Sequence, residues 1–365
     1  MKVLQITNDY TNTKLYDNLF SALSKQDIES IVFCPNCYVT KVDDNIKIVK
    51  CFRKVDRLFY FLKQKKIFKA LEGKIKPFNE VNLVHAHTLF TDGNIANKVF
   101  KKYGIPYIVA VRNTDINTFY KFKKYLSHLG ERIMLDAKAI VFLSNSYKNC
   151  IVNKHISKKN REIIEKKSFV IPNGIDDFWH ENSNSHQRDK AQIRVIYAGA
   201  IDKNKNLLST ARALSLLVEQ NFSVSFNAIG RCDNAKILNS LKAYSFFTHK
   251  NQMKKEDLIF EYRKSDIFVM PSYYETFGLV YAEAMSQGLP VIYSRGQGFD
   301  GQFEEGCVGY RVNSSSYQDI ASKILIIVNQ YDAISKRCVM NSQKFRWSSI
   351  SLIYCNLYKS ILNIN

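Results

Sequence analysis

Two glutamates eight residues apart, Glu275 and Glu283, are the side chains of this sequence best placed to do chemistry. The apolar run 267–270 predicts a buried strand, and the polar residues after it predict a loop that enters a helix near Gly278 or Leu279. A helix N-terminus has free N–H groups and a partial positive charge, so it suits a diphosphate. Glu275 would then lie in the loop at the ligand. Glu283 would lie one turn inside the helix, where its carboxylate can accept hydrogen bonds from a ribose diol.

A structural interpretation of both glutamates stays open, with Glu275 as a helix cap and Glu283 as a solvated helix residue. A second strand, 193–198, also ends in a polar loop, where Lys203 or Lys205 could neutralise phosphate or be solvated. A third segment ends in the Asn-Gly turn 173–174, which could be part of a site or a simple turn.

Length and composition bound the class of protein. The chain has 365 residues, of which 46% are hydrophobic, so it can bury two or three cores and is not a disordered chain. Gly (14) and Pro (6) are too rare for a fibrous protein. No apolar run approaches the roughly 18 residues of a membrane span, and residues 1–9 turn polar too early for a signal peptide.

The eight cysteines are scattered, which predicts reduced thiols in a cytoplasmic protein. Cys34 and Cys37 have a suggestive spacing, but no second pair supports a metal site. His85 and His87 point the same way on a strand, as a metal pair would, yet no acidic cluster accompanies them. We therefore expect no metal and no cofactor, with His85 structural and His87 close to a ligand.

The positive charge is concentrated in the first half of the chain. Residues 1–172 hold 31 basic and 15 acidic residues, out of a net charge of +20 for the whole chain. Residues 53–76 hold nine basic and two acidic residues with apolar side chains between them, and Lys121, Lys123 and Lys124 lie among aromatic residues. Such a surface attracts an anionic membrane or nucleic acid, unless it is simply solvated. Without any nucleic-acid-binding signature, we favour the membrane over nucleic acid.

Short apolar runs alternate with helical patterns twice along the chain, which predicts two parallel sheets covered on both faces. We expect an N-terminal Rossmann-like domain over 1–173, a polar linker over 174–192 and a second Rossmann-like domain over 193–345. An amphipathic helix over 346–365 would pack back on the N-terminal domain. Ligands of such sheets bind beyond the carboxyl ends of the strands.

Three segments in this order match a known family: Ile-Pro-Asn-Gly-Ile-Asp, Gly-x5-Lys-Asn and Pro-Ser-x-x-Glu-x-Phe-Gly-x4-Glu-Ala. Together they resemble the retaining nucleotide-sugar glycosyltransferases of family 4, which have the GT-B fold of two Rossmann-like domains facing across a cleft. The resemblance extends over nearly the whole chain. It implies an α/β enzyme that moves a sugar from a UDP- or GDP-linked donor to a glycan or lipid-linked acceptor with retention of configuration.

The resemblance also implies roles for single residues. Glu275 would contact the transferred sugar, Glu283 the ribose, and Lys205 the diphosphate. The nucleotide-sugar site would further contain Gly199, Arg231 and the backbone amides of Phe277, Gly278 and Leu279. In the N-terminal domain, Arg112 stands where many members have histidine and would join Glu275 and Lys205 in catalysis. The acceptor side would contain Asn8, Asp9, His87, Asn113 and Asp115.

Three departures from the family pattern concern phosphate and acceptor binding: no glycine in the loop after the first strand, Arg112 in place of histidine, and Ala200 in place of a frequent arginine. The departures at Arg112 and Ala200 leave a non-catalytic nucleotide-sugar-binding protein open. A sugar-nucleotide epimerase or a phosphorylase stays open because it would share the fold. The expected location is the cytoplasm, peripherally on the inner face of the plasma membrane through residues 53–76, in cell-surface polysaccharide synthesis.

Overall fold

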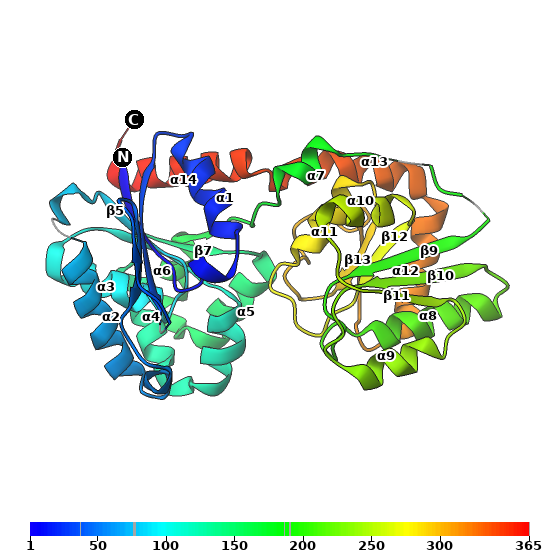
Figure 1. The fold of residues 1–365 in the computed structure, drawn as a ribbon, viewed down its shortest axis with the longest axis horizontal. Helices are drawn as coiled ribbons and strands as arrows, with labels where there is room; N and C mark the ends of the chain where they lie inside the picture. Colours follow the sequence, from blue (N-terminus) through cyan, green and yellow to red (C-terminus); the bar gives the residue numbers. More distant parts are fainter. Residues whose placement is uncertain (37, 76–77, 186, 190, 365) are drawn as a thin grey trace. The chain divides into compact units, whose positions relative to one another are not determined.

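The structure is a computed structural model that describes residues 1–36, 38–75, 78–185, 187–189 and 191–364. The chain forms two compact units, each built on its own sheet (Figure 1). Unit 1 consists of Met1–Leu143, Tyr147–Pro172 and Trp347–Asn365, and unit 2 of Ser144–Ser146 and Asn173–Arg346. Cys37 and Lys76, which belong to two of the sequence patterns above, lie outside the described residues. The cysteines within the described ranges are free thiols.

In the described residues, the sheet of unit 1 has eight strands in the order β3-β4-β2-β1-β5-β6-β7-β8. All neighbours are parallel except β3, which runs antiparallel to β4. The strands are β1 Lys2–Ile6, β2 Glu29–Asn36, β3 Lys41–Val42, β4 Ile46–Lys50, β5 Leu83–Ala86, β6 Tyr107–Ala110, β7 Ala139–Phe142 and β8 Ser168–Val170.

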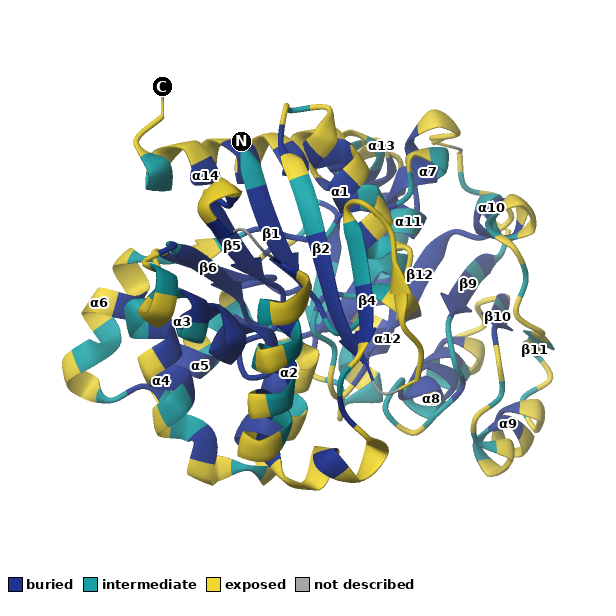
Figure 2. Ribbon diagram, turned by 60° about the vertical axis from the view of Figure 1, so that its left-hand side comes forward, coloured by how far each residue is buried: buried dark blue, intermediate teal, exposed yellow. Residues whose placement is uncertain are grey.

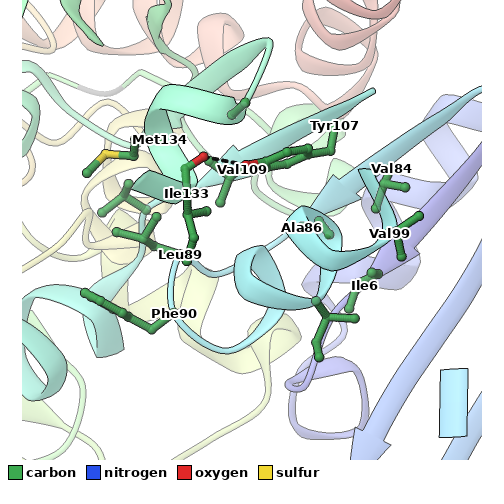
Figure 3. Packing of buried hydrophobic residues seen from close by; sticks show 14 of the residues in the cluster. Ile6, Val84, Ala86, Leu89, Phe90, Val99, Tyr107, Val109, Ile133 and Met134 are labelled. Carbon is green, nitrogen blue, oxygen red and sulfur yellow. Dashed lines mark hydrogen bonds between the residues drawn. The ribbon is translucent and has the colours of Figure 1, made fainter. Parts of the chain in front are cut away.

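Both faces of this sheet are buried, because successive side chains of a strand alternate between them. Leu4 and Val84 belong to the hydrophobic cluster on one face, whereas their neighbours Val3 and Leu83 belong to the cluster on the other. In the first cluster, the Tyr107 hydroxyl donates a hydrogen bond of 2.5 Å to a helix carbonyl among the packed side chains (Figure 3). The predicted doubly covered α/β sheet is therefore confirmed.

Helices of unit 1 lie on either side of the sheet (Figure 1). They are α1 Leu15–Ser24, α2 Tyr60–Lys74, α3 Asp92–Tyr103, α4 Ser127–Asp136, α5 Asn145–His155, α6 Arg161–Lys166 and α14 Trp347–Leu362. Single turns of 3-10 helix are η1 Tyr10–Asn12, η2 Lys54–Leu58, η3 Phe78–Glu80, η5 Lys124–Leu126 and η6 Lys158–Asn160, and η4 Asp115–Tyr120 is a π-helix.

The C-terminal helix α14 packs beside α1, as the sequence predicts (Figure 1). Its buried side chains Trp347, Ile350 and Tyr354 join Val3 and Leu83 in the second cluster. Both ends of the chain thus contribute to unit 1.

In the described residues, unit 2 has a six-stranded parallel sheet in the order β11-β10-β9-β12-β13-β14. Its strands are β9 Ile193–Ala198, β10 Val224–Ile229, β11 Phe247–Lys250, β12 Ile267–Met270, β13 Val291–Ser294 and β14 Gly309–Val312. Its helices are α7 Asp177–Glu181, α8 Leu207–Glu219, α9 Ala235–Lys242, α10 Lys255–Arg263, α11 Leu279–Ser286, α12 Tyr317–Asn329 and α13 Tyr331–Ser342, followed by the 3-10 turn η7 Gln343–Phe345.

Residues 174–192, expected to be a polar linker, contain the short helix α7. Its Trp179 and His180 are buried, and the Trp179 ring packs against Tyr262 of α10. This segment therefore belongs to unit 2. Over the described ranges, no helix combines the length and the apolar character that crossing a bilayer requires.

Candidate functional site

The loop after β12 leads from a fully buried strand to the start of α11. Gly278 precedes the helix with φ 76° and ψ 73°, a left-handed conformation that favours glycine. A Cβ at this position would lie 2.6 Å from the ring of Tyr281. The first turn of α11 has no acidic residue, so its positive dipole end meets no carboxylate of the helix itself. This end of the helix can bind an anion.

Lys205 and Glu275 form an ion pair in front of this helix. The ammonium of Lys205 lies 2.7 Å from Oε2 of Glu275, and the two side chains are 21% and 15% exposed. The backbone N–H of Lys205 donates to the carboxylate of Asp202, which fixes the turn between β9 and α8. The structure thus brings together two residues that are 70 positions apart in the chain.

Two further side chains, which sequence reasoning did not assign, hold the Glu275 loop. Asn204 accepts from the N–H of Tyr274 at 2.9 Å and donates to the carbonyl of Tyr274 at 2.8 Å. Gln297, in the loop after β13, accepts from the N–H of Glu275 at 3.0 Å. The N–H of Gly298 donates to the carbonyl of Glu275 at 2.6 Å. The loop that carries Glu275 is therefore tied to the loops that follow two other strands.

Gly298 shows how closely these loops pack. A Cβ built on Gly298 would lie 1.9 Å from the carbonyl oxygen of Thr276, so no larger residue fits there without displacing the Glu275 loop. The Gly-Gln-Gly sequence 296–298 was the only sign of this contact in the sequence.

A cavity of about 360 Å³ opens beside the same helix and is large enough for part of a small ligand. Its lining includes Gly199, Arg231 and Val280, the second residue of α11. Gly199 and Gly230 have φ of 147° and 148°, and a Cβ on Gly230 would lie 2.0 Å from the carbonyl oxygen of Gly199. Arg231 is exposed and forms two hydrogen bonds with Asp233. The glycines thus let the backbone itself form the cavity wall.

Phe277 and Leu279 flank Gly278. The Phe277 ring is buried against Phe345, with ring centroids 5.5 Å apart, so this residue offers a ligand only its backbone. Leu279 is the first residue of α11, and its side chain is half-buried.

Glu283 lies one turn inside α11 and is half-buried. Burial, together with the negative charge of Asp176, raises the pKa of Glu283 to about 7, although Lys255 opposes the shift. Lys255 forms an ion pair of 2.7 Å with Asp176, which also caps α7 by accepting from the N–H of Phe178. The third sequence segment therefore reaches this site through Asp176.

Arg112 lies in unit 1, at the end of β6. Its side chain is half-buried, and in the described part of the chain its Nη1 atom has no hydrogen-bond partner. Burial is the main cause that lowers the pKa values of His85 and His87. The positive charge of Arg112 lowers both further. This guanidinium is therefore placed to bind an additional anionic or hydroxyl group.

Asp115 is fully buried, and three backbone N–H groups donate to its carboxylate. The donors are Leu89 at 2.9 Å, Phe90 at 3.0 Å and Arg112 at 2.9 Å. Burial raises the pKa of Asp115 to about 6, against the effect of these hydrogen bonds. Asp115 therefore ties the loop after β5 to the loop after β6 and so positions Arg112. Its carboxylate is used by these hydrogen bonds and is not free.

His87 is also fully buried, in a stack with His85 whose ring centroids are 4.0 Å apart. Nε2 of His87 donates to the side-chain Oε1 of Gln5 at 2.9 Å, because the side-chain Nε2 of Gln5 donates to the hydroxyl of Ser30. The ring of His85 bonds the hydroxyl of Tyr358 in α14 at 2.7 Å. This pair connects the sheet to the C-terminal helix.

The remaining acceptor-side residues differ in exposure. Asn8 and Asp9 follow β1 and are half-buried, and Asn113 is exposed and bonded to Asn117. Oδ1 of Asn8 is buried without a hydrogen-bond partner among the described residues. Within the described ranges, no group of three His, Cys, Asp or Glu side chains has a geometry that could hold a metal ion.

Comparison with protein families gives matches to both halves of the chain. The family "Glycosyl transferases group 1" matches residues 180–345, and "Glycosyltransferase Family 4" matches residues 14–177. The capsular polysaccharide biosynthesis glycosyltransferase CapM of Staphylococcus aureus is 26% identical over 61% of this chain and 60% of CapM. The alpha-monoglucosyldiacylglycerol synthase of Acholeplasma laidlawii is 27% identical over 65% of this chain and 64% of that protein. Both alignments span less than two thirds of the relative.

Among solved structures, HepE of Anabaena in complex with UDP is similar with a TM-score of 0.72. The match covers 99% of this chain and 100% of HepE at 14% identity. At this identity the likeness concerns the fold. HepE has also been solved with UDP-glucose.

Proposed function

Since this chain belongs to the group 1 glycosyltransferases and has the GT-B fold, we propose that it moves a sugar from a UDP- or GDP-linked donor to a glycan or lipid-linked acceptor with retention of configuration. The ion pair between Lys205 and Glu275 in front of α11 supports this most directly. It places a cation, a carboxylate and free helix N–H groups around one point, which suits a sugar joined to a diphosphate.

The donor is proposed to lie along the start of α11. Lys205 and the amides of residues 277–279 would bind the diphosphate. The nucleoside would occupy the cavity beside Gly199 and Arg231, and Glu283 would accept hydrogen bonds from the ribose. The names of the HepE structures, with UDP and with UDP-glucose, favour a nucleotide sugar as the ligand of this fold.

In the proposed reaction, the acceptor oxygen bonds to the anomeric carbon while the bond from that carbon to the diphosphate oxygen breaks. The bonding electrons and the acceptor proton go to the departing diphosphate. Lys205 and the helix amides stabilise the negative charge that develops there. Glu275 holds the transferred sugar, and Lys205 must first exchange the carboxylate of Glu275 for the phosphate. Because Lys205 supplies the positive charge, the scheme requires no metal ion.

The acceptor is proposed to bind unit 1, with Arg112 toward its reacting end and Asn8, Asp9 and Asn113 around it. The basic residues of segment 53–76 would hold the protein peripherally on the inner, anionic face of the plasma membrane. The names of two relatives, a capsular polysaccharide glycosyltransferase and a glucosyldiacylglycerol synthase, support an acceptor in the cell envelope and a role in cell-surface polysaccharide synthesis.

A thermal-shift panel with UDP, GDP, ADP, CMP and their sugar conjugates tests the donor proposal. A ligand at 100 times its Kd stabilises a protein by roughly 2.7 kcal/mol, which is easily detected. We expect one nucleotide to raise the Tm, and the increase to be lost in Glu283→Ala. No shift with any nucleotide would favour a non-catalytic protein.

Product analysis separates transfer from the reactions of related enzymes. We expect release of free nucleotide only when an acceptor glycan or lipid extract is present, and a product whose anomeric configuration, read by NMR, equals that of the donor. Nucleotide release without an acceptor, or phosphate-dependent release of a sugar phosphate, would indicate an epimerase or a phosphorylase instead.

A further inference from the structure

Large apolar side chains are exposed where η2 meets α2. Leu58, Phe59, Phe61 and Leu62 are 76%, 58%, 64% and 48% exposed. The apolar side chains that lie between the basic residues of this segment differ in burial. Ile67 and Leu71 are buried in the core, whereas the four residues at the start are exposed. Figure 2 shows both buried and exposed residues along α2.

A second segment, remote in sequence, extends this exposed surface. Phe122 and Tyr125, around η5, are 71% and 64% exposed. Buried Tyr60 links the segments, because its ring contacts Phe61 at 5.2 Å and Phe119 of η4 at 6.0 Å between centroids. The exposed side chains of the two segments are here called the apolar patch: Leu58, Phe59, Phe61, Leu62, Phe122 and Tyr125.

Cationic side chains surround the apolar patch. Lys121 lies over the ring of Phe122, and Lys123 over the ring of Phe119, at 5.2 and 5.3 Å from the ring centroids. Burial lowers the pKa of Lys63, and the positive charges of Arg57 and Lys123 add to the shift, which shows that the two segments carry their cations close together. The one acid of residues 53–69, Asp56, is buried and paired with Lys66 at 2.7 Å.

Hydrogen bonds to the loop after β5 hold the helix that carries part of the apolar patch in place. The hydroxyl of Tyr60 donates to the carbonyl of Phe90 at 2.7 Å, and the amide of Gln64 donates to the carbonyl of Thr91 at 3.1 Å. Both carbonyls belong to the loop after β5, which Asp115 ties to Arg112. The patch is therefore fixed to the same loops that position Arg112.

We propose that the apolar patch inserts into the interfacial layer of a bilayer that contains anionic lipid, so that the protein is anchored by apolar insertion as well as by charge. The proposal rests on the proposed function for its link to a lipid-borne acceptor. Single exposed apolar residues are common, but six in one patch mark an interaction surface. Aromatic rings and flanking lysines are the side chains that bilayer interfaces favour, and Lys and Arg are attracted to an anionic surface.

Vesicle flotation of the full chain tests this proposal, with phosphatidylcholine vesicles containing one quarter phosphatidylglycerol. We expect the double variant Phe61→Ser, Phe122→Ser to partition at least tenfold more weakly than the wild type. The matched control is Phe260→Ser on α10 of unit 2, which removes a ring that is 56% exposed, and should partition within twofold of the wild type.

A salt series distinguishes apolar insertion from charge attraction, because salt screens the attraction between charges and leaves apolar insertion in place. Wild-type binding should fall but persist in 0.5 M salt, whereas Lys65→Glu, Lys124→Glu should weaken binding mainly in low salt. Complete loss of wild-type binding in 0.5 M salt, or equal binding of the wild type and the double serine variant, would overturn the insertion proposal.

A fluorescent probe measures depth directly. Both native tryptophans, Trp179 and Trp347, are buried, so Phe61→Trp introduces an exposed reporter. We expect brominated lipid to quench the new emission strongly and the wild-type emission little. Absence of quenching would contradict insertion.

Two controls separate this proposal from its competitors. A dimer that dissociates in the double serine variant, without vesicle binding by the wild type, would assign the patch to a second protein copy and overturn the proposal. The nucleotide thermal shift should be equal in the wild type and the double serine variant. Absence of that shift in both proteins would refute the proposed function but leave the insertion result standing.

Discussion

In front of α11, the side chains expected to react are partly exposed and paired with each other. In unit 1, two of the side chains expected to hold the acceptor are buried and bonded to the protein. Lys205 and Glu275 face one another at 2.7 Å, whereas Asp115 bonds three backbone amides and His87 bonds Gln5. Unit 1 exposes instead the apolar patch and the lysines beside it.

The two proposals above explain this difference by two kinds of partner. A diphosphate has a fixed shape and charge, so a few polar groups on neighbouring loops are enough to recognise it. A membrane-borne acceptor would be located by a surface as well as by single side chains. On these proposals, Asp115 and His87 hold loops in place, and the apolar patch supplies the surface for contact.

The largest expected effect sharpens the donor half of this comparison. Lys205→Ala and Glu275→Ala should each lower kcat by at least about 100-fold, or about 2.7 kcal/mol of barrier, because the leaving diphosphate and the sugar lose their direct contacts. Steady-state kinetics with the identified donor measures this. The exposed neighbour Lys203, changed to Ala, is the control and should stay close to wild type. Activity within threefold of wild type in either variant would remove that residue from catalysis.

The next effect concerns the acceptor half. Asp115→Ala should lower the free energy of unfolding by about 2 kcal/mol, because buried N–H groups lose their acceptor. Urea unfolding followed by circular dichroism measures the change. Asp115→Asn keeps one acceptor oxygen and should lose less. Unchanged stability in Asp115→Ala would contradict the structural role and return Asp115 to the list of acceptor ligands.

A smaller effect is expected from pH. With a pKa of about 7, Glu283 is mostly protonated at pH 6 and mostly ionised at pH 8. Only the carboxylate accepts two hydrogen bonds from a ribose diol, so nucleotide affinity should rise up to about tenfold over this range. Titration calorimetry at several pH values checks this, and Glu283→Gln should remove the dependence. Since the folded pKa is raised from 4.5, the free energy of unfolding should also fall as pH rises from about 4.5 to 7. An affinity that is equally flat in both proteins would rule out a ribose contact.

The smallest expected effect concerns metal removal, which should not change kcat. If Lys205 and the amides of α11 carry the leaving-group charge, EDTA should leave kcat unchanged within experimental error. Assays with and without chelator, followed by added Mg²⁺ or Mn²⁺, measure this. A loss with EDTA that Mg²⁺ restores would show that a metal shares the diphosphate with Lys205.

Sequence patterns predict the interior of both sheets well, because buried parallel strands are continuous apolar runs. The strands they missed lie at sheet edges: β3, β11 and β14. β11 reads Phe-Thr-His-Lys and β14 begins with Gly309, so neither is an apolar run. An edge strand pairs with a neighbouring strand on one side only. The local sequence does not reveal which strand that neighbour is.

The same limit applies to the site. The Glu275 loop and the start of α11 are local features, and their spacing was visible in the sequence. Asn204 and Gln297 were not found, because they act on this loop from 70 and 22 positions away. The family resemblance implied Asp115 and His87 at the acceptor side, but the sequence does not show that each finds its partners inside the protein.

The position of α14 has a consequence for how the protein is made. The sheet of unit 1 is complete after β8, but one of its faces, which α1 covers in part, is fully covered only when Trp347–Leu362 has been made. A ribosome adding about 5–20 residues per second needs roughly ten to thirty seconds to cross the residues of unit 2 that separate them. During synthesis, the N-terminal half therefore waits with apolar surface uncovered while the later half can already fold, and chaperone contacts should concentrate on the part of the protein that is made first.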